Sequence, residues 1–323
     1  MRLVLAYDGS ACADAARDLV ARVPLPAGSA VTLITALERG PRAFGAGEFA
    51  VATPESDEAE AQLLADLQTM LHDAAEPLRT ADRHVDTRVV RGRPASAIVD
   101  EAVAIGPDLL VVGSRGHGPL ASVVMGSVSA EVVDHAPCPV LVARHPSVSR
   151  LVVGADGSAS ADRALALLRR WPIFAGHPAT IVTVTEPASA WAGRIGTAIY
   201  PAWADAHESR GDRSAEARIV AQRGVEELAR AGISAAAELR EGDPADQLIR
   251  AAEVTDADLI VVGSRGLSTL PRLLIGSVAR KVLLHAPQSV LILRETRERV
   301  REPKRDEARE RRALPAGAVM ALA

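Results

Sequence analysis

Short apolar runs alternate with amphipathic stretches along most of the chain. The run Leu3–Tyr7 precedes an Ala-rich stretch that reaches Val23, and Val31–Leu37 is a second apolar run. Continuous runs of β-branched residues and leucine are typical of buried parallel strands, whereas apolar residues at helical spacing indicate an amphipathic helix. The pattern therefore predicts strands that are separated by helices.

The same alternation continues to residue 145. A long helix is predicted over residues 55–82, because its leucines and Met70 fall at helical spacing. Another helix begins at Pro94, where a missing N–H costs little. The other expected elements are strands at 84–90, 109–112 and 140–142 and a helix at 127–134. The pattern predicts an α/β fold, in which a doubly wound, Rossmann-like sheet of five parallel strands in the order 3-2-1-4-5 carries helices on both faces.

The whole pattern occurs twice. The segment RLVLAYDGSACAD from Arg2 recurs from Arg150 as RLVVGADGSASAD, and DLLVVGSRG from Asp108 recurs from Asp258 as DLIVVGSRG. A repeat of this length is the size of a domain, so we interpret the chain as a tandem duplication rather than a solenoid. The predicted units are residues 1–145 (copy one), residues 149–294 (copy two) and a charged tail at 295–323.

The tail lies outside the repeat. It contains eight Lys or Arg and six Asp or Glu between Glu295 and Arg312. Two interpretations stay open, namely a solvated extension and a docking arm for a partner.

Composition excludes several classes of protein. The 323 residues have a net charge of −4 and only 2% aromatic side chains, which argues against nucleic acid or an acidic membrane as a partner. Cys12 and Cys138 are far apart, which excludes a disulfide framework and fits a reducing compartment. The sequence has no apolar stretch of the roughly 20 residues that a membrane span needs. We therefore expect a cytoplasmic protein.

A glycine motif follows the predicted fourth strand of each copy. Its form is G-x2-G-x9-G-S, with the glycines at 113, 116 and 126 in copy one and at 263, 266 and 276 in copy two. Glycine allows a ligand to approach the backbone closely, and the amides at a helix N-terminus attract an anion. The motif therefore predicts a phosphate-binding loop that lacks the lysine of a P-loop. Ordinary turn and packing glycines are the alternative.

Asp-Gly-Ser follows the first strand of each copy, with the aspartates at Asp8 and Asp156. Because the first and fourth strands are neighbours in the order 3-2-1-4-5, this sequence lies at the crevice where ligands of open α/β sheets bind. The carboxylate is expected to accept hydrogen bonds from ribose hydroxyls or an adenine amino group. Capping of the following helix is a second reading of the same residues.

These residues resemble the ATP-binding branch of the universal stress protein family, and the resemblance covers both copies. It implies ATP as the ligand, with Mg²⁺ as a possible companion, and an adenine pocket lined by Ala36 and Val184. It also implies that the last strands of two domains pair, here between the copies as an internal pseudo-dimer or between two chains as a homodimer. The other implied contacts in copy one are Asp8, Gly113, Gly116, Gly126, Ser127, Val128 and Ser129. In copy two they are Asp156, Gly263, Gly266, Gly276, Ser277 and Val278.

Copy two departs from the pattern at Ala279, where copy one has the hydroxyl of Ser129. Arg115 and Arg265 are candidates for charge-assisted contacts to phosphate, and ion pairs at the surface or between domains are an equal alternative. The sequence offers no general base, metal-ligand cluster or P-loop lysine. We therefore expect a regulatory ATP-binding protein, without catalytic residues, that acts on a signalling partner of unknown kind. A slow ATPase and a nucleotide-free interaction protein are the alternatives.

Overall fold

The computed structural model describes residues 1–38, 54–116, 125–185, 205–264 and 275–294. Copy one consists of β1 (Arg2–Ala6), α1 (Ala11–Arg22), β2 (Ser29–Leu37), α2 (Pro54–Ala75), the 3-10 helix η1 (Glu76–Leu78), β3 (Arg83–Arg91), α3 (Pro94–Ile105), β4 (Leu109–Gly113), α4 (Ser127–His135) and β5 (Val140–Ala143). The tail at 295–323 lies outside the described residues.

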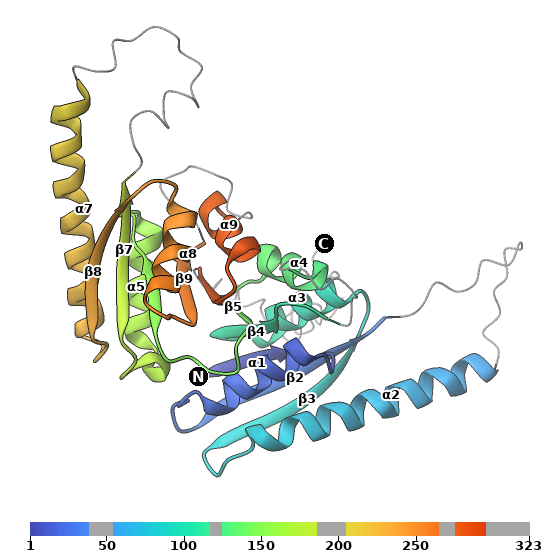
Figure 1. Cartoon of the computed structure of the whole chain (residues 1–323). Coiled ribbons are helices and arrows are strands. Elements are labelled where there is room, and N and C mark those ends of the chain that lie inside the picture. The colour runs from blue at the N-terminus through green and yellow to red at the C-terminus, as the bar shows by residue number, and fades with distance from the viewer. Residues whose placement is uncertain (39–53, 117–124, 186–204, 265–274, 295–323) are drawn as a thin grey trace, which may run out of the picture.

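Copy two repeats this order of elements. It consists of β6 (Leu151–Gly154), α5 (Ala159–Arg170), the 3-10 helix η2 (Pro172–Phe174), β7 (Ala179–Thr185), α7 (Asp205–Ala229), β8 (Ala235–Glu241), α8 (Pro244–Val254), β9 (Leu259–Gly263), α9 (Ser277–His285) and β10 (Ser289–Leu293). Figure 1 shows the two copies as two α/β units whose sheets meet between α4 and α9.

The strand order confirms the expected α/β topology. Each copy contributes five parallel strands, in the order β3-β2-β1-β4-β5 and β8-β7-β6-β9-β10. β5 and β10 pair antiparallel, with Leu141 opposite Leu291. The two sheets thus form one ten-stranded sheet across both copies.

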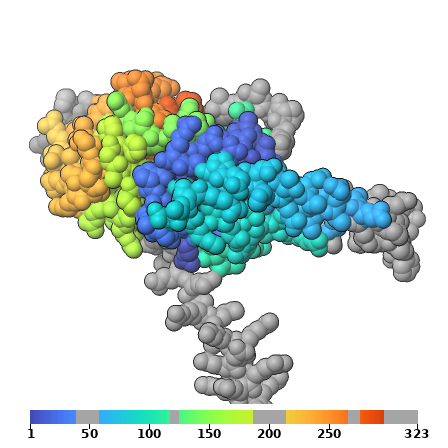
Figure 2. Space-filling view, turned by 90° about the horizontal axis from the view of Figure 1, so that it is seen from below, coloured from blue at the N-terminus to red at the C-terminus, as the bar shows by residue number. Residues whose placement is uncertain are grey.

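Helices cover both faces of the sheet because its strands are apolar on both faces. Leu3 and Leu5 of β1 pack beneath α1 and α2, whereas Val4 lies on the face that α3 and α4 cover. Every residue of β4 is buried, as its unbroken run of apolar residues predicts. Copy two has the same layers, with α5 and α7 on one face and α8 and α9 on the other. In the space-filling view the copies lie side by side, and α2 extends beyond the rest of copy one (Figure 2).

The predicted end of the long helix is wrong. The helix expected over 55–82 ends as α2 at Ala75, and a single 3-10 turn continues it to Leu78. Pro77 lies in that turn and has no N–H to continue the helical hydrogen bonds. The chain then turns into β3 one residue earlier than expected, at Arg83.

Candidate functional site

Hydrogen bonds through the hydroxyl of Ser10 connect the start of α1 to the loop after β4. The hydroxyl of Ser10 accepts a hydrogen bond from the amide of Ala13 at 3.2 Å, which makes Ser10 the N-cap of α1. The same hydroxyl donates to the carbonyl oxygen of Arg115 at 3.2 Å. Ser10 therefore joins the ends of β1 and β4, which are neighbours in the sheet.

The aspartates do not cap the helices, so that reading of the sequence is wrong. Oδ1 of Asp8 accepts a hydrogen bond from the amide of Ser10 at 3.0 Å, and Oδ1 of Asp156 accepts one from the amide of Ser158 at the same distance. Ser158 is the N-cap of α5, as Ser10 is of α1. The positive φ of the intervening glycine, 78° at Gly9, places the serine rather than the aspartate at the cap position.

Asp8 instead faces the glycine loop. A Cβ atom on Gly116 would lie 2.5 Å from Oδ2 of Asp8, which is far inside van der Waals contact. The backbone of the loop therefore passes directly over this carboxylate. Two of the predicted site residues, from the ends of β1 and β4, are thus brought together.

The other two glycines of copy one have different surroundings. A Cβ atom on Gly113 would lie 2.8 Å from the backbone carbon and oxygen of Cys12, so this glycine is needed for the packing of α1 against β4. A Cβ atom on Gly126 would lie 3.3 Å from the Cα atom of Arg115, where the two ends of the loop meet. The packing alternative therefore holds for Gly113, while Gly116 and Gly126 line the loop itself.

The N-terminus of α4 opens onto the same loop. The amide of Gly126 donates to the carbonyl of Ser114 at 2.9 Å, and Gly126 is an N-cap without a side-chain hydrogen bond. The first amide that reaches back to Gly126 is that of Ala130, so the amides of Ser127, Val128 and Ser129 have no intrahelical acceptor. Helix N-termini of this kind bind anions.

The hydroxyl of Ser129 is used inside the protein. Ser129 is buried, and its Oγ donates to the carbonyl of Gly113 at 2.7 Å, so it supports the end of β4. At the equivalent position in copy two, Ala279 is buried and cannot make this bond. The copies therefore differ in how the helix holds the strand beneath the loop.

Copy two shows the same geometry where it is described. The amide of Gly276 donates to the carbonyl of Ser264 at 2.8 Å, and Gly276 is the N-cap of α9 without a side-chain hydrogen bond. Gly263 ends β9, and Ser277 and Val278 form the first turn of α9. Arg265 and Gly266 lie outside the described residues.

Arg115 lies near the junction of the two copies. Burial, and to a smaller extent the charge of Arg115, lowers the pKa of Arg144, which follows β5, to about 10. The pair of cations places positive potential beside the copy-one loop. The position of Arg115 is compatible with both of its sequence interpretations, a phosphate contact and a contact between domains.

A cavity of about 360 Å³ opens where β2 and β3 end, and Glu38, Arg91, Gly92 and Arg93 line it. Its size is typical of small-molecule sites. Ala36 is the residue of β2 that pairs with Val90 of β3 just before this cavity. Arg91 is the last residue of β3 and Arg93 is the N-cap of α3, so both lie at the carboxyl edge of the sheet, where ligands of α/β folds bind.

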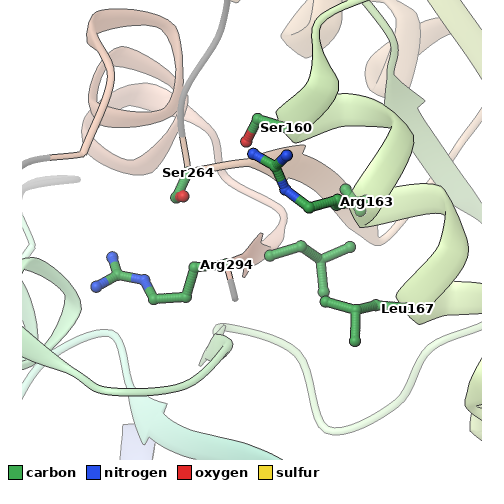
Figure 3. A pocket seen from close by; sticks show the side chains of 7 residues that line it. Ser160, Arg163, Leu167, Ser264 and Arg294 are labelled. Atoms are coloured by element: carbon green, nitrogen blue, oxygen red, sulfur yellow. The ribbon is translucent and has the colours of Figure 1, made fainter. Parts of the chain in front are cut away.

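A second cavity, of about 10 Å³, lies in copy two between α5 and the ends of β9 and β10. In Figure 3 the guanidinium of Arg163 points toward the hydroxyl of Ser160, while Arg294 extends away from both. The volume admits a single water molecule, so this cavity is not a nucleotide site.

Within the described ranges, no three His, Cys, Asp or Glu side chains lie together as a metal site would require. No described helix is long and apolar enough to cross a membrane.

Comparisons with known proteins agree with this architecture. A universal stress protein of Thermus aquaticus is 32% identical over 142 residues, which are 44% of this chain and 97% of that protein. A universal stress protein of Mycobacterium tuberculosis, Rv2623, is 29% identical over 237 residues, which are 68% of this chain and 71% of that one. The crystal structure of a universal stress protein from Archaeoglobus fulgidus superimposes with a TM-score of 0.63 at 18% identity, covering 91% of this chain and 98% of that one, which shows the fold.

The family profile of the universal stress proteins matches the chain twice, over residues 1–144 and 148–294. The two matches together span both halves of the ten-stranded sheet. The chain therefore belongs to the universal stress protein family, as a member with two family domains in tandem.

Proposed function

We propose that this protein binds ATP at the edge of the sheet where β1 and β4 end, and that it acts as a regulator in a stress response. One observation carries the proposal. The carboxylate of Asp8 lies beside Gly116, and the N-terminus of α4 meets the start of the same loop through Gly126, at the point where the strand order reverses.

The residues fit the chemistry of a nucleotide. The uncapped amides of Ser127, Val128 and Ser129 suit phosphate oxygens, because they combine hydrogen-bond donors with the positive end of the helix dipole. Oδ2 of Asp8 suits a ribose hydroxyl or an adenine amino group. Gly116 has no side chain, so a ligand can approach the backbone at this point. A methyl group here would contact the carboxylate of Asp8. Bound ATP would bring Mg²⁺ with it through its phosphates.

Equilibrium dialysis of the full chain against ATP and Mg²⁺ tests the proposal. Binding at submillimolar ATP is expected, and Gly126→Ala combined with Gly276→Ala should abolish it while circular dichroism stays unchanged. The absence of binding at millimolar ATP, or unchanged binding by the double variant, would refute the proposal. Analysis of the recovered nucleotide for ADP distinguishes binding from slow hydrolysis.

Two free cysteines fit a reducing compartment. We therefore place this activity in the cytoplasm. Fractionation of cells that produce the protein, followed by immunoblotting, tests this location.

A further inference from the structure

Each glycine loop begins with a hydrogen bond to the last strand of its own copy. The amide of Ser114 donates to the carbonyl of Ala143 at 3.1 Å, and the amide of Ser264 donates to that of Leu293 at 2.7 Å. Ala143 and Leu293 are the last residues of β5 and β10. The start of each loop is therefore held by the strand that pairs with the other copy.

The residue after each of these strands reaches across to the other copy. The guanidinium of Arg294, directly after β10, donates to the carbonyl of Val133 in the last turn of α4 at 2.5 Å. The guanidinium of Arg144, directly after β5, donates to the carbonyl of Leu283 in the last turn of α9 at 2.6 Å. Each arginine thus connects the loop start of its own copy to a helix of the other copy.

The two helices lead back to the loops. α4 and α9 are nine residues long, and their N-caps are Gly126 and Gly276. The amide of Gly126 donates to the carbonyl of Ser114 at 2.9 Å, and the amide of Gly276 donates to that of Ser264 at 2.8 Å. A short helix is a rigid element, so a shift at its C-terminal end is passed on to the loop at its N-terminal end.

These contacts close on themselves and pass through both proposed ATP sites. We call them the closed network; its members are Ser114, Arg144, α9, Gly276, Ser264, Arg294, α4 and Gly126. Its hydrogen bonds are 3.1 Å long or shorter, and those of the arginines are charge-assisted. α4 and α9 lie side by side where the copies meet (Figure 1), and Asp134 pairs with Arg280 there at 2.6 Å.

We propose that ATP bound in one copy raises the affinity of the other copy, and that Arg144 and Arg294 are the positioning residues that couple the two sites. This inference rests on the proposed ATP binding. A bound phosphate fixes one loop and the first turn of one helix, and the closed network then holds the second loop in the same geometry. The second ATP loses less conformational entropy on binding, which makes the binding positively cooperative. Coupling of this kind is reciprocal, so it acts equally from either copy.

Calorimetric titration with MgATP measures the coupling. Gly276→Ala leaves copy one as the intact site, and Gly126→Ala leaves copy two. Independent sites would give the unaltered chain an isotherm equal to the sum of the two single-copy isotherms. We expect instead that the second MgATP binds about fivefold or more tightly than the single-copy constants allow.

Loss of the arginines tests the route. Arg144→Met with Arg294→Met should make the isotherm equal to the sum of the single-copy isotherms that are measured with the same two substitutions. The coupling is the ratio of the affinities with the other site filled and empty, so a loss of affinity that is common to both states cancels. A merely structural role of the arginines would therefore leave this ratio unchanged.

Arg2→Met with Arg150→Met is the matched control. Arg2 donates to the carbonyl of Ile105 at the end of α3 at 3.0 Å, and Arg150 donates to that of Thr255 at the end of α8 at 2.7 Å. These substitutions remove the same kind of bond, from an arginine to the end of a helix, but within one copy. The coupling should persist in this variant.

Hydrogen exchange gives a second measurement that needs only one intact site. In the Gly276→Ala chain, saturation of copy one with MgATP should slow the exchange of amides in α9, which belongs to copy two. Arg144→Met should remove this effect, and Arg150→Met should not. Because each of these chains carries only one arginine substitution, this measurement also decides the case in which the chain without both Arg144 and Arg294 does not fold.

The outcomes separate the two proposals. Two MgATP that bind independently, or one per chain, would overturn the inference and leave ATP binding intact. Coupling that survives the loss of both Arg144 and Arg294, or that the control variant loses equally, would overturn the role of these arginines. Failure of the unaltered chain to bind MgATP would overturn both proposals. Cooperative binding that is lost with Arg144 and Arg294 alone would support both.

Discussion

Arg144 and Arg294 occupy equivalent positions at the ends of β5 and β10, and each holds the C-terminal end of a helix in the other copy. The guanidinium of Arg144 donates to the carbonyls of Leu283 and Gln288 at 2.6 and 3.0 Å. That of Arg294 donates to Val133 and Ala136 at 2.5 and 3.0 Å. The helices are α9 and α4, whose N-termini open onto the proposed ATP sites. A cation is favourable at this end of a helix.

Replacement of either arginine should destabilise the junction of the copies. Arg294→Met keeps an unbranched apolar side chain but leaves the carbonyls of Val133 and Ala136 without their donor. Loss of charge-assisted hydrogen bonds of this kind costs about 3 kcal/mol. Urea unfolding monitored by circular dichroism measures this loss, with Arg79→Met as the exposed control. A change no larger than that of the control would show that the contacts contribute nothing.

Gly113→Ala should lower the stability of copy one. The new methyl group would meet the backbone of Cys12 at 2.8 Å, and neither β4 nor the start of α1 can move without disturbing the sheet. Overpacking of this kind costs about 1–3 kcal/mol. Thermal unfolding of the variant checks the direction. An unfolding temperature equal to that of the parent would mean that α1 shifts freely.

Gly116→Ala should spare the fold and weaken ATP binding. Here the methyl group meets the end of a side chain, the carboxylate of Asp8, which rotates away at little cost. The rotation takes the carboxylate from the place proposed for the nucleotide. We expect unchanged unfolding together with a loss of affinity of about tenfold or more in the Gly276→Ala background. Loss of stability without loss of affinity would contradict the role given to Asp8.

Tyr7 should make the stability of the protein depend on pH in the alkaline range. Burial and the hydrogen bond from its hydroxyl to Asp14, at 2.7 Å, raise the pKa of Tyr7 to about 12 from 10.0. Between these values the folded chain keeps a proton that the unfolded chain has lost, so stability falls as pH rises through this window. Urea unfolding at several alkaline pH values should show this decline, and Tyr7→Phe should flatten it. An equal slope in the variant would assign the decline to other groups.

The sequence predicts much of the fold because its strands are continuous apolar runs and because the pattern is repeated. β4 and β9 have this character, and the order of the strands follows from the rules for parallel sheets. The end of α2 is predicted too late, because the spacing of the apolar residues that indicate the helix ends at Leu71, and Pro77, which has no N–H, stops the helix before residue 82.

The sequence predicts where the candidate site lies better than it predicts what each residue of the site does. Asp-Gly-Ser contains two residues that can cap a helix, and only the turn at Gly9 decides that Ser10 does so. Ser129 carries a hydroxyl that suits phosphate, yet in the fold this hydroxyl reaches the carbonyl of Gly113. Which residue caps the helix, and which atom a hydroxyl contacts, depends on distances between segments that are far apart in the chain.

Because β5 pairs with β10 inside one chain, the two copies can have different amino-acid sequences and still form this interface. In a symmetric homodimer every substitution appears in both subunits, so the two sites stay identical. Here one gene product carries both partners, and their encounter does not depend on protein concentration. Ser129 and Ala279, or Arg93 and Asp243, can therefore diverge without any loss of the shared sheet.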